Sequence, residues 1–212
     1  MSVEAEVRRD GPRSKRARIL TAAIEQFGKE GYEHTKWAAI AGEVGIGQTA
    51  LYHYFESKAH CLLTIMRLEL TDSTDRFNRS TAGIGDPEEA LRAAIAASLQ
   101  GDPIDALQRR ILQNHMDILA SPRQSTKEEE ERQRSRELVA AVERDWAALI
   151  ERGIAAGAFT PTAPPLITAR LVLGMLVSVW RWYRPGGPVT IDELTEVVSN
   201  SAVQMVSARG QD

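Results

Sequence analysis

The chain has 212 residues, of which 43% are apolar and 26% are charged, a composition that suits one or two compact domains and argues against disorder. The formal net charge is −3, so the molecule as a whole is not a polycation and any nucleic-acid surface must be local. The single cysteine, Cys61, excludes an intrachain disulfide and favours a cytoplasmic location.

No membrane segment is expected. Residues 1–16 lack the apolar core of a signal peptide. The longest apolar segment, 166–180, is interrupted by Arg170 and is shorter than the roughly 20 residues that span a bilayer.

Apolar residues recur at helical spacing along almost the whole chain. The first predicted helix ends at Gly31 and has one apolar face: Ile19, Leu20, Ala23, Ile24 and Phe27. Helices are also predicted to start at Asp86-Pro87 and at Asp102-Pro103, the second of them continuing through His115 to Leu119.

A long helix is predicted over 125–156, and two more near 165–184 and 190–207. The charged opening of the long helix, TKEEEERQRSRE, is typical of a solvated helix face. No alternating run of β-branched residues and no internal repeat is found. The expected fold class is therefore all-α.

The most informative stretch is AAIAGEVGIGQTALYHYFESK, residues 38–58. A helix-turn-helix needs a small residue where its helices cross and a glycine four residues later, where the turn has a positive φ. Ala41 and Gly45 have this spacing. The required interior positions then hold Ile40, Val44, Ile46, Leu51 and Tyr54. This agreement favours a DNA-reading motif over an unrelated pair of short helices.

The same region resembles the tetracycline-repressor (TetR) family of bacterial regulators. The matching residues are Ala23, Phe27, Gly31, Tyr32, Thr35, the segments IAGEVGI and LYHYF, and Lys58. The resemblance implies about nine helices: a three-helix DNA-binding head over 13–62, and a larger domain over 63–212 that binds a small-molecule effector and dimerises. Residues 1–12 are expected to form a basic, disordered arm.

By this resemblance, a recognition helix near 47–54 enters the major groove of a double-stranded DNA operator. Gln48, Thr49 and Ala50 would face base edges, whereas other residues would contact phosphates. The candidate DNA-binding residues are Lys36, Trp37, Gly47, Gln48, Thr49, Ala50, Tyr52, His53 and Lys58. Lys36, Trp37 and Gly47 depart from the commoner family residues, so the operator sequence does not transfer.

A basic cluster lies just before the first predicted helix: Arg8, Arg9, Arg13, Lys15, Arg16 and Arg18. The cluster is either a solubilising tail or an arm that contacts phosphate or the minor groove. Beside a helix-turn-helix, we favour the DNA-contacting arm.

No catalytic or metal-binding pattern is found. The four histidines form no HExxH motif or Cys/His cluster, and no phosphate-binding loop follows a strand. Cys61 lies beside Leu62 and Leu63 and is interpreted as a core residue. We therefore expect neither a cofactor nor an enzyme. A ligand-released repressor is favoured over an architectural DNA-binding protein and over an enzyme built on a helical bundle.

The last two predicted helices are apolar enough to form a two-fold dimer interface, which a palindromic operator requires. The alternative is that both helices complete the core of one chain. The candidate interface residues are Leu173, Leu176, Val179, Leu194 and Val198.

An effector cavity is expected in the middle of the larger domain. Its candidate residues are Met66, Phe77, Arg110, Asn114, His115 and Trp146. His115 lies one helical turn from Ile111 and Leu119, so it is predicted to point toward the apolar side of its helix. The alternative is that His115 is an ordinary core histidine.

The stretch VWRWYRPGGP, residues 179–188, is predicted to end a helix, with Arg181 and Arg184 beside the negative helix end. It also resembles TetR-family regulators of fatty-acid and steroid breakdown, several of which respond to acyl-CoA thioesters. That resemblance implies a phosphate-binding role for Arg181 and Arg184. The rival effector is an uncharged lipophilic molecule.

Overall fold

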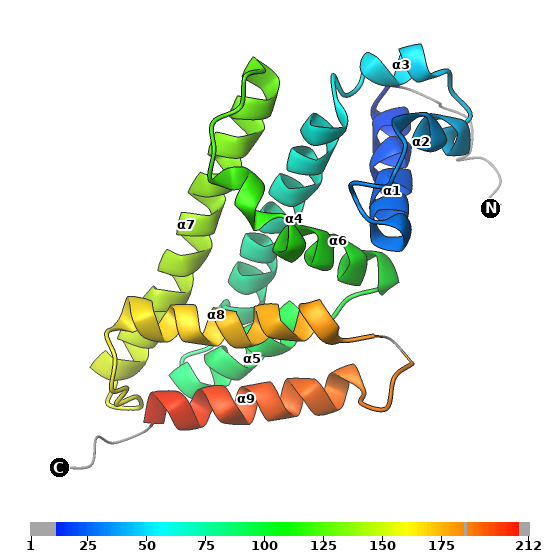
Figure 1. The fold of residues 1–212 in the computed structure, drawn as a ribbon. Coiled ribbons are helices and arrows are strands. Elements are labelled where there is room, and N and C mark those ends of the chain that lie inside the picture. Colours follow the sequence, from blue (N-terminus) through cyan, green and yellow to red (C-terminus); the bar gives the residue numbers. More distant parts are fainter. Residues whose placement is uncertain (1–11, 185, 208–212) are drawn as a thin grey trace, which may run out of the picture.

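The computed structural model describes residues 12–184 and 186–207, and every regular element in these residues is helical (Figure 1). The all-α prediction is confirmed. The helices are α1 (Pro12–Glu30), α2 (Trp37–Val44), α3 (Gln48–Tyr52), α4 (Lys58–Thr81), α5 (Pro87–Leu99), α6 (Pro103–Asn114), the 3₁₀ helix η2 (Met116–Leu119), α7 (Thr126–Ala155), α8 (Pro165–Trp182) and α9 (Ile191–Ser207).

The predicted helix-turn-helix is formed by α2 and α3. Gly45 follows α2 with φ +74°, a left-handed conformation in which a side chain would be strained. Ile40 and Leu51 are fully buried, and Ala41 is nearly so. The turn glycine and the interior positions are where the sequence pattern predicted them.

The basic cluster belongs partly to α1. Residues 1–11 of the predicted arm lie outside the described residues, and α1 begins at Pro12. The Arg16 guanidinium lies 4.5 Å from the ring centroid of Phe55, and Arg18 Nη2 donates to the Val44 carbonyl at 3.3 Å. Arg16 and Arg18 therefore belong to α1 rather than to an arm before it, and their side chains fasten α1 to the rest of the head.

The three-helix head (α1 to α3) and the larger helical domain that follows it, called the body below, share helix α4. One buried cluster joins α1, α2 and α3 to the first half of α4 and to α6, while a second joins α5, α7, α8 and α9. The predicted domain boundary between residues 62 and 63 falls inside α4, which passes through it without a break (Figure 1). The two parts are therefore connected by one continuous helix rather than by a linker.

The helix predicted to run through Leu119 ends earlier. His115 follows α6 with φ −125° and ψ 20°, outside the helical region, and η2 comes next. Arg132 Nη1 donates to the Leu119 carbonyl at 2.8 Å, an acceptor that is free because the helix has ended there. Because α6 ends before His115, the side chain of His115 does not lie on the helical face that the sequence predicted.

The charged opening of α7 is only partly solvated. Glu128 and Glu131 are 8% and 7% exposed. Glu128 Oε1 accepts from Ser57 Oγ at 2.5 Å, and Glu131 pairs with Arg67. The prediction of a solvated face is wrong for these glutamates, because they fix the start of α7 to the first half of α4.

Candidate DNA-binding and effector sites

The recognition helix α3 presents an exposed face. Gln48, Thr49, Tyr52 and His53 are exposed and Ala50 is partly buried, whereas Leu51 is fully buried and anchors the helix. Gly47 precedes α3 in an extended conformation and supplies no side-chain cap. This arrangement leaves the predicted base-facing and phosphate-facing side chains accessible.

The start of α2 separates two predicted DNA contacts. Lys36 is exposed, whereas Trp37 is only 9% exposed and belongs to the core of the head. The indole Nε1 of Trp37 is buried without a hydrogen-bond partner among the described residues. A buried ring is not available to DNA, so we remove Trp37 from the interface.

Lys58 begins α4, but its ammonium is occupied by the head. Nζ donates to the carbonyls of Tyr32 at 2.6 Å, Glu33 at 3.2 Å and Thr35 at 3.2 Å, and it lies 4.4 Å from the ring centroid of Tyr32. Three acceptors match the three donors of an ammonium. In this conformation the predicted phosphate contact is replaced by a structural one: Lys58 fastens the α1–α2 loop to α4.

A cavity of about 200 Å³ lies in the body, bounded by residues of α4, α5, α6, η2, α7 and α8. Trp146, a predicted effector residue, is part of its wall. The apolar lining consists of Leu70, Leu112, Met116, Val139, Val142, Trp146, Leu173, Leu176, Val177 and Trp180.

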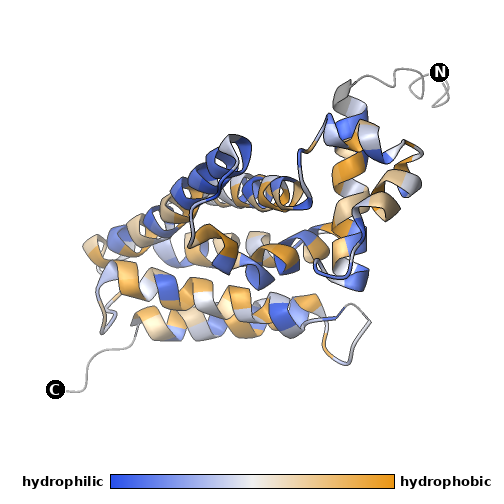
Figure 2. Ribbon diagram, turned by 45° about the horizontal axis from the view of Figure 1, so that its top comes forward, coloured by the Kyte–Doolittle hydropathy of each residue, from blue (hydrophilic) through white to orange (hydrophobic). Residues whose placement is uncertain are grey.

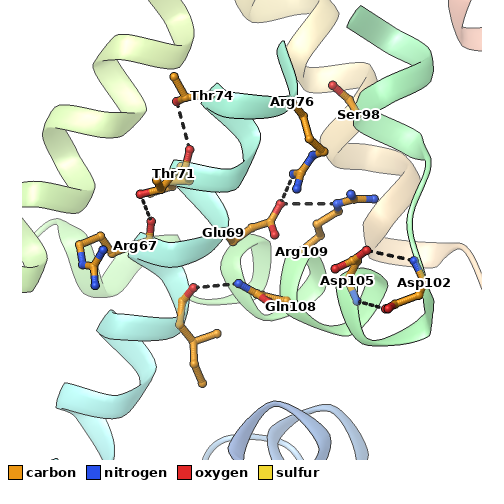
Figure 3. Close-up of polar contacts among 12 residues, drawn as sticks. Arg67, Glu69, Thr71, Thr74, Arg76, Ser98, Asp102, Asp105, Gln108 and Arg109 are labelled. Atoms are coloured by element: carbon orange, nitrogen blue, oxygen red, sulfur yellow. Dashed lines mark hydrogen bonds and ion pairs between the residues drawn. The ribbon is translucent and has the colours of Figure 1, made fainter. Parts of the chain in front are cut away.

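One wall of this cavity carries three charged side chains (Figure 3). Glu69 Oε1 accepts from Arg76 Nη2 at 2.5 Å and lies 3.5 Å from Arg109 Nε. Glu69 and Arg109 are 3% and 4% exposed. Burial raises the pKa of Glu69 and lowers the pKa of Arg109, which the neighbouring positive charge of Arg76 lowers further.

The sequence analysis did not identify Glu69, Arg76 or Arg109 as cavity residues and named Arg110, the neighbour of Arg109, instead. Arg109 lies one turn from buried Ala106 and from buried Leu112, so a charge on the buried face of α6 was the signal that could have found it. Of the other predicted lining residues, Met66 is fully buried in the head-side cluster. Phe77 packs its ring 5.3 Å from Trp146 and does not border the cavity.

The remaining predicted residues near α6 line a different hollow. Arg110, Asn114, His115 and Arg184 surround a groove of about 390 Å³ beside the α1–α2 loop. The His115 ring lies 5.3 Å from Tyr32, and burial lowers the pKa of His115. The expectation that His115 points into the central cavity is wrong, because α6 ends at Asn114 and the side chain turns toward the head.

The predicted helix stop at VWRWYRPGGP is present, since α8 ends at Trp182. Arg110 donates from Nη2 to the Tyr183 carbonyl at 3.0 Å and from Nε to the Trp180 carbonyl at 3.4 Å, which caps the helix from α6. Trp180 is buried with its ring 4.8 Å from the Arg109 guanidinium, whereas Arg181 and Trp182 are exposed.

Four of the predicted dimer residues lie in the interior of the chain. Leu176, Val179, Leu194 and Val198 are each 8% exposed or less, so their assignment to a dimer interface is wrong; they complete the core, which was the alternative. Leu173 is partly buried and borders the cavity. The exposed large apolar side chains of the same two helices are Leu166, Ile167, Leu171, Trp182 and Val197.

The exposed recognition helix on a helical body defines a DNA-binding transcriptional regulator rather than an enzyme. Residues 19–65 match the family model "Bacterial regulatory proteins, tetR family", and residues 85–206 match "Tetracyclin repressor-like, C-terminal domain". The chain belongs to the TetR family of regulators.

Individual members of this family are similar to the chain in sequence and in fold. The chain is 27% identical over 186 residues to the HTH-type transcriptional repressor KstR2 of Rhodococcus jostii (strain RHA1), covering 88% of each protein. Its fold matches the ketosteroid transcriptional regulator KstR2 of Mycobacterium tuberculosis with a TM-score of 0.75 and 24% identity, over 94% of this chain and 98% of that one. AibR in complex with isovaleryl coenzyme A and operator DNA matches with a TM-score of 0.71 and 20% identity, over 91% and 98%.

The Lys58 contact generates a prediction that separates its structural role from a phosphate contact. Lys58→Met should lower the free energy of unfolding by about 1–2 kcal/mol, because three charge-assisted hydrogen bonds are lost from a partly buried group. The slope of log K against log salt for DNA binding should stay at the wild-type value. Thermal unfolding and salt titrations measure both quantities.

Lys36→Met is the matched control, because Lys36 is exposed. It should leave the unfolding midpoint unchanged and reduce the salt slope by about 0.9 for each bound copy of the chain, the value for one lost phosphate contact per head. If Lys58→Met instead behaved like this control, the structural role of Lys58 would be disproved.

Proposed function

We propose that this protein is a cytoplasmic, ligand-released repressor that binds a palindromic operator as a two-fold dimer. The observation that carries the proposal is the continuity of α4, which holds the head at Lys58 and borders the body cavity at Glu69 and Arg76. A ligand that binds the cavity better in one orientation of α4 than in another would shift the position of the heads. An architectural DNA-binding protein without an effector would have no need of this cavity.

Operator reading is assigned to α3. Gln48 and Thr49 are exposed at the start of the recognition helix, where side chains reach base edges in the major groove. Ala50 is partly buried and supplies at most a methyl contact. Tyr52 and His53, exposed at the other end of α3, are assigned to phosphates.

Gln48→Ala should weaken binding to the operator by about 1–3 kcal/mol and relax preference at one base pair, because a bidentate contact to a base is lost. Tyr52→Phe is the comparison variant and should weaken all sequences evenly. Fluorescence anisotropy on the operator and on single-base variants measures the pattern. An even loss across sequences for Gln48→Ala would remove Gln48 from base reading.

The dimer interface is reassigned to the outward faces of α8 and α9. Both helices lie side by side along one edge of the body, away from the head, and carry apolar segments there (Figures 1 and 2). Leu171 and Val197 are 52% and 61% exposed, large fractions for apolar side chains. Gly174 is also exposed, with open space beside it, and would permit close approach of a second copy.

Leu171→Glu combined with Val197→Glu should yield folded monomers that lose most operator affinity, because charges would be buried between the copies and two heads could no longer bind together. Sedimentation velocity gives the oligomeric state and circular dichroism the fold. Ala148→Glu, an exposed position of α7, is the control and should remain dimeric. A double variant that stays dimeric would refute this interface.

The proposed effector is a small lipophilic molecule, with an acyl-CoA thioester as the first candidate and an uncharged lipophilic compound as its rival. AibR was crystallised with isovaleryl coenzyme A, which supports the thioester. In this chain, Arg184 lines the groove together with Arg110. Burial lowers the pKa of Arg110, and the nearby positive charge of Arg184 lowers it further. Two neighbouring cations would suit the phosphates of a CoA group.

Calorimetry should show tighter binding of hexanoyl-CoA than of the free fatty acid hexanoate, with a loss of about tenfold or more in Arg184→Ala, because phosphate contacts to a guanidinium are charge-assisted. Arg181→Ala is the comparison, since Arg181 is exposed on α8 and lies outside the groove. Equal affinity for fatty acid and acyl-CoA, unchanged in Arg184→Ala, would favour the uncharged effector.

A further inference from the structure

The charged wall of the central cavity holds more buried donors than acceptors. Arg109 Nη1 and Arg76 Nε are buried without a hydrogen-bond partner among the described residues, and Arg109 Nε has only the 3.5 Å ion pair with Glu69. Both guanidinium groups approach the same oxygen of Glu69 (Figure 3). Since buried donors are nearly always paired in native proteins, these nitrogens mark a place for an acceptor that the chain itself does not provide.

Other carboxylates near this wall are already engaged or exposed. Asp105 Oδ2 accepts from the Asp102 backbone N–H at 3.0 Å as part of a capping box. Glu143, which also borders the cavity, pairs with Arg170 at 2.8 Å. Asp72 is exposed on α4. Within the cavity, the two arginines therefore share Glu69 as their bonded counter-ion.

We propose that the cavity binds the carboxylate of a small apolar acid, with Arg109 and Arg76 as its anion-binding residues. The inference deepens the proposed function, because it names the chemical class of the effector end that enters the body. A carboxylate supplies two acceptor oxygens for these nitrogens and a negative charge beside two guanidinium groups, for which Glu69 is the bonded carboxylate and Asp72 and Asp105 act only from farther away.

The volume and apolar lining of the cavity limit the size and polarity of the rest of this acid. A cavity of about 200 Å³ is of the same order as the engineered cavity of about 150 Å³ that holds benzene. The apolar walls around the ligand space include Trp146, Trp180 and Leu176. A single ring or a short chain fits this space. The carboxylate belongs either to a free acid or to the far end of an acyl thioester.

The test uses 4-phenylbutanoate and its neutral counterpart 4-phenylbutan-1-ol, with intrinsic tryptophan fluorescence as the readout, since Trp146 and Trp180 border the cavity. The acid should bind wild type at least tenfold more tightly than the alcohol. Arg109→Met should abolish this preference. Arg67→Met removes a partly buried arginine that does not border the cavity and should keep the preference.

Glu69→Gln separates ligand binding from a purely structural ion cluster. Removing the internal carboxylate frees both arginines, so affinity for 4-phenylbutanoate should rise severalfold. This measurement, together with the wild-type comparison, decides the proposal even if Arg109→Met does not fold. Equal binding of acid and alcohol by wild type, or weaker acid binding by Glu69→Gln, would overturn it.

Two further arms identify the source of the carboxylate and separate this inference from the proposed function. Tighter binding of adipoyl-CoA than of hexanoyl-CoA supports a thioester with a distal carboxylate, and preference for 4-phenylbutanoate alone supports a free acid. Operator release is measured with the same compounds. A neutral ligand that fills the cavity and releases DNA refutes only the carboxylate; an acid that binds without release refutes only the repressor mechanism.

Discussion

The structure depends on α4 being a single continuous helix that belongs to both halves of the molecule. Its 24 residues correspond to a length of about 36 Å. At its first turn Lys58 binds three carbonyls of the α1–α2 loop, and Glu69 and Arg76 lie farther along, on the wall of the cavity. Ser57 and Glu128 add a bond between the start of α4 and α7. One helix therefore contacts both the cavity and the head.

The features that local interactions decide were predictable from sequence. Gly45 is required by the three-residue turn between α2 and α3, whatever the rest of the chain does. Asp86 and Asp102 cap their helices through backbone N–H groups two or three residues away, so α5 and α6 begin where the sequence places them. The same locality explains why α8 stops before the Pro-Gly segment.

The features that tertiary packing decides were not predictable. The apolar pattern of α8 covers most of its circumference, and nothing in it tells Leu176, which faces the core, from Leu171, which faces outward. Trp37 begins an exposed motif yet packs inward. Glu128 reads as a solvated helix residue, and only the position of Ser57 on a distant segment explains its burial.

The heavy side chains of VWRWYRPGGP form part of the connection between cavity and head. Trp180 borders the cavity and stacks on Arg109, while its carbonyl accepts from Arg110, so two successive arginines of α6 hold the end of α8. Two residues before Arg109, α6 touches the head closely, since a Cβ on Gly28 of α1 would lie 2.6 Å from Leu107. Through Arg109 and Leu107, α6 therefore contacts both the cavity and α1. This second connection reinforces α4, because both helices link the same cavity to the same three-helix head.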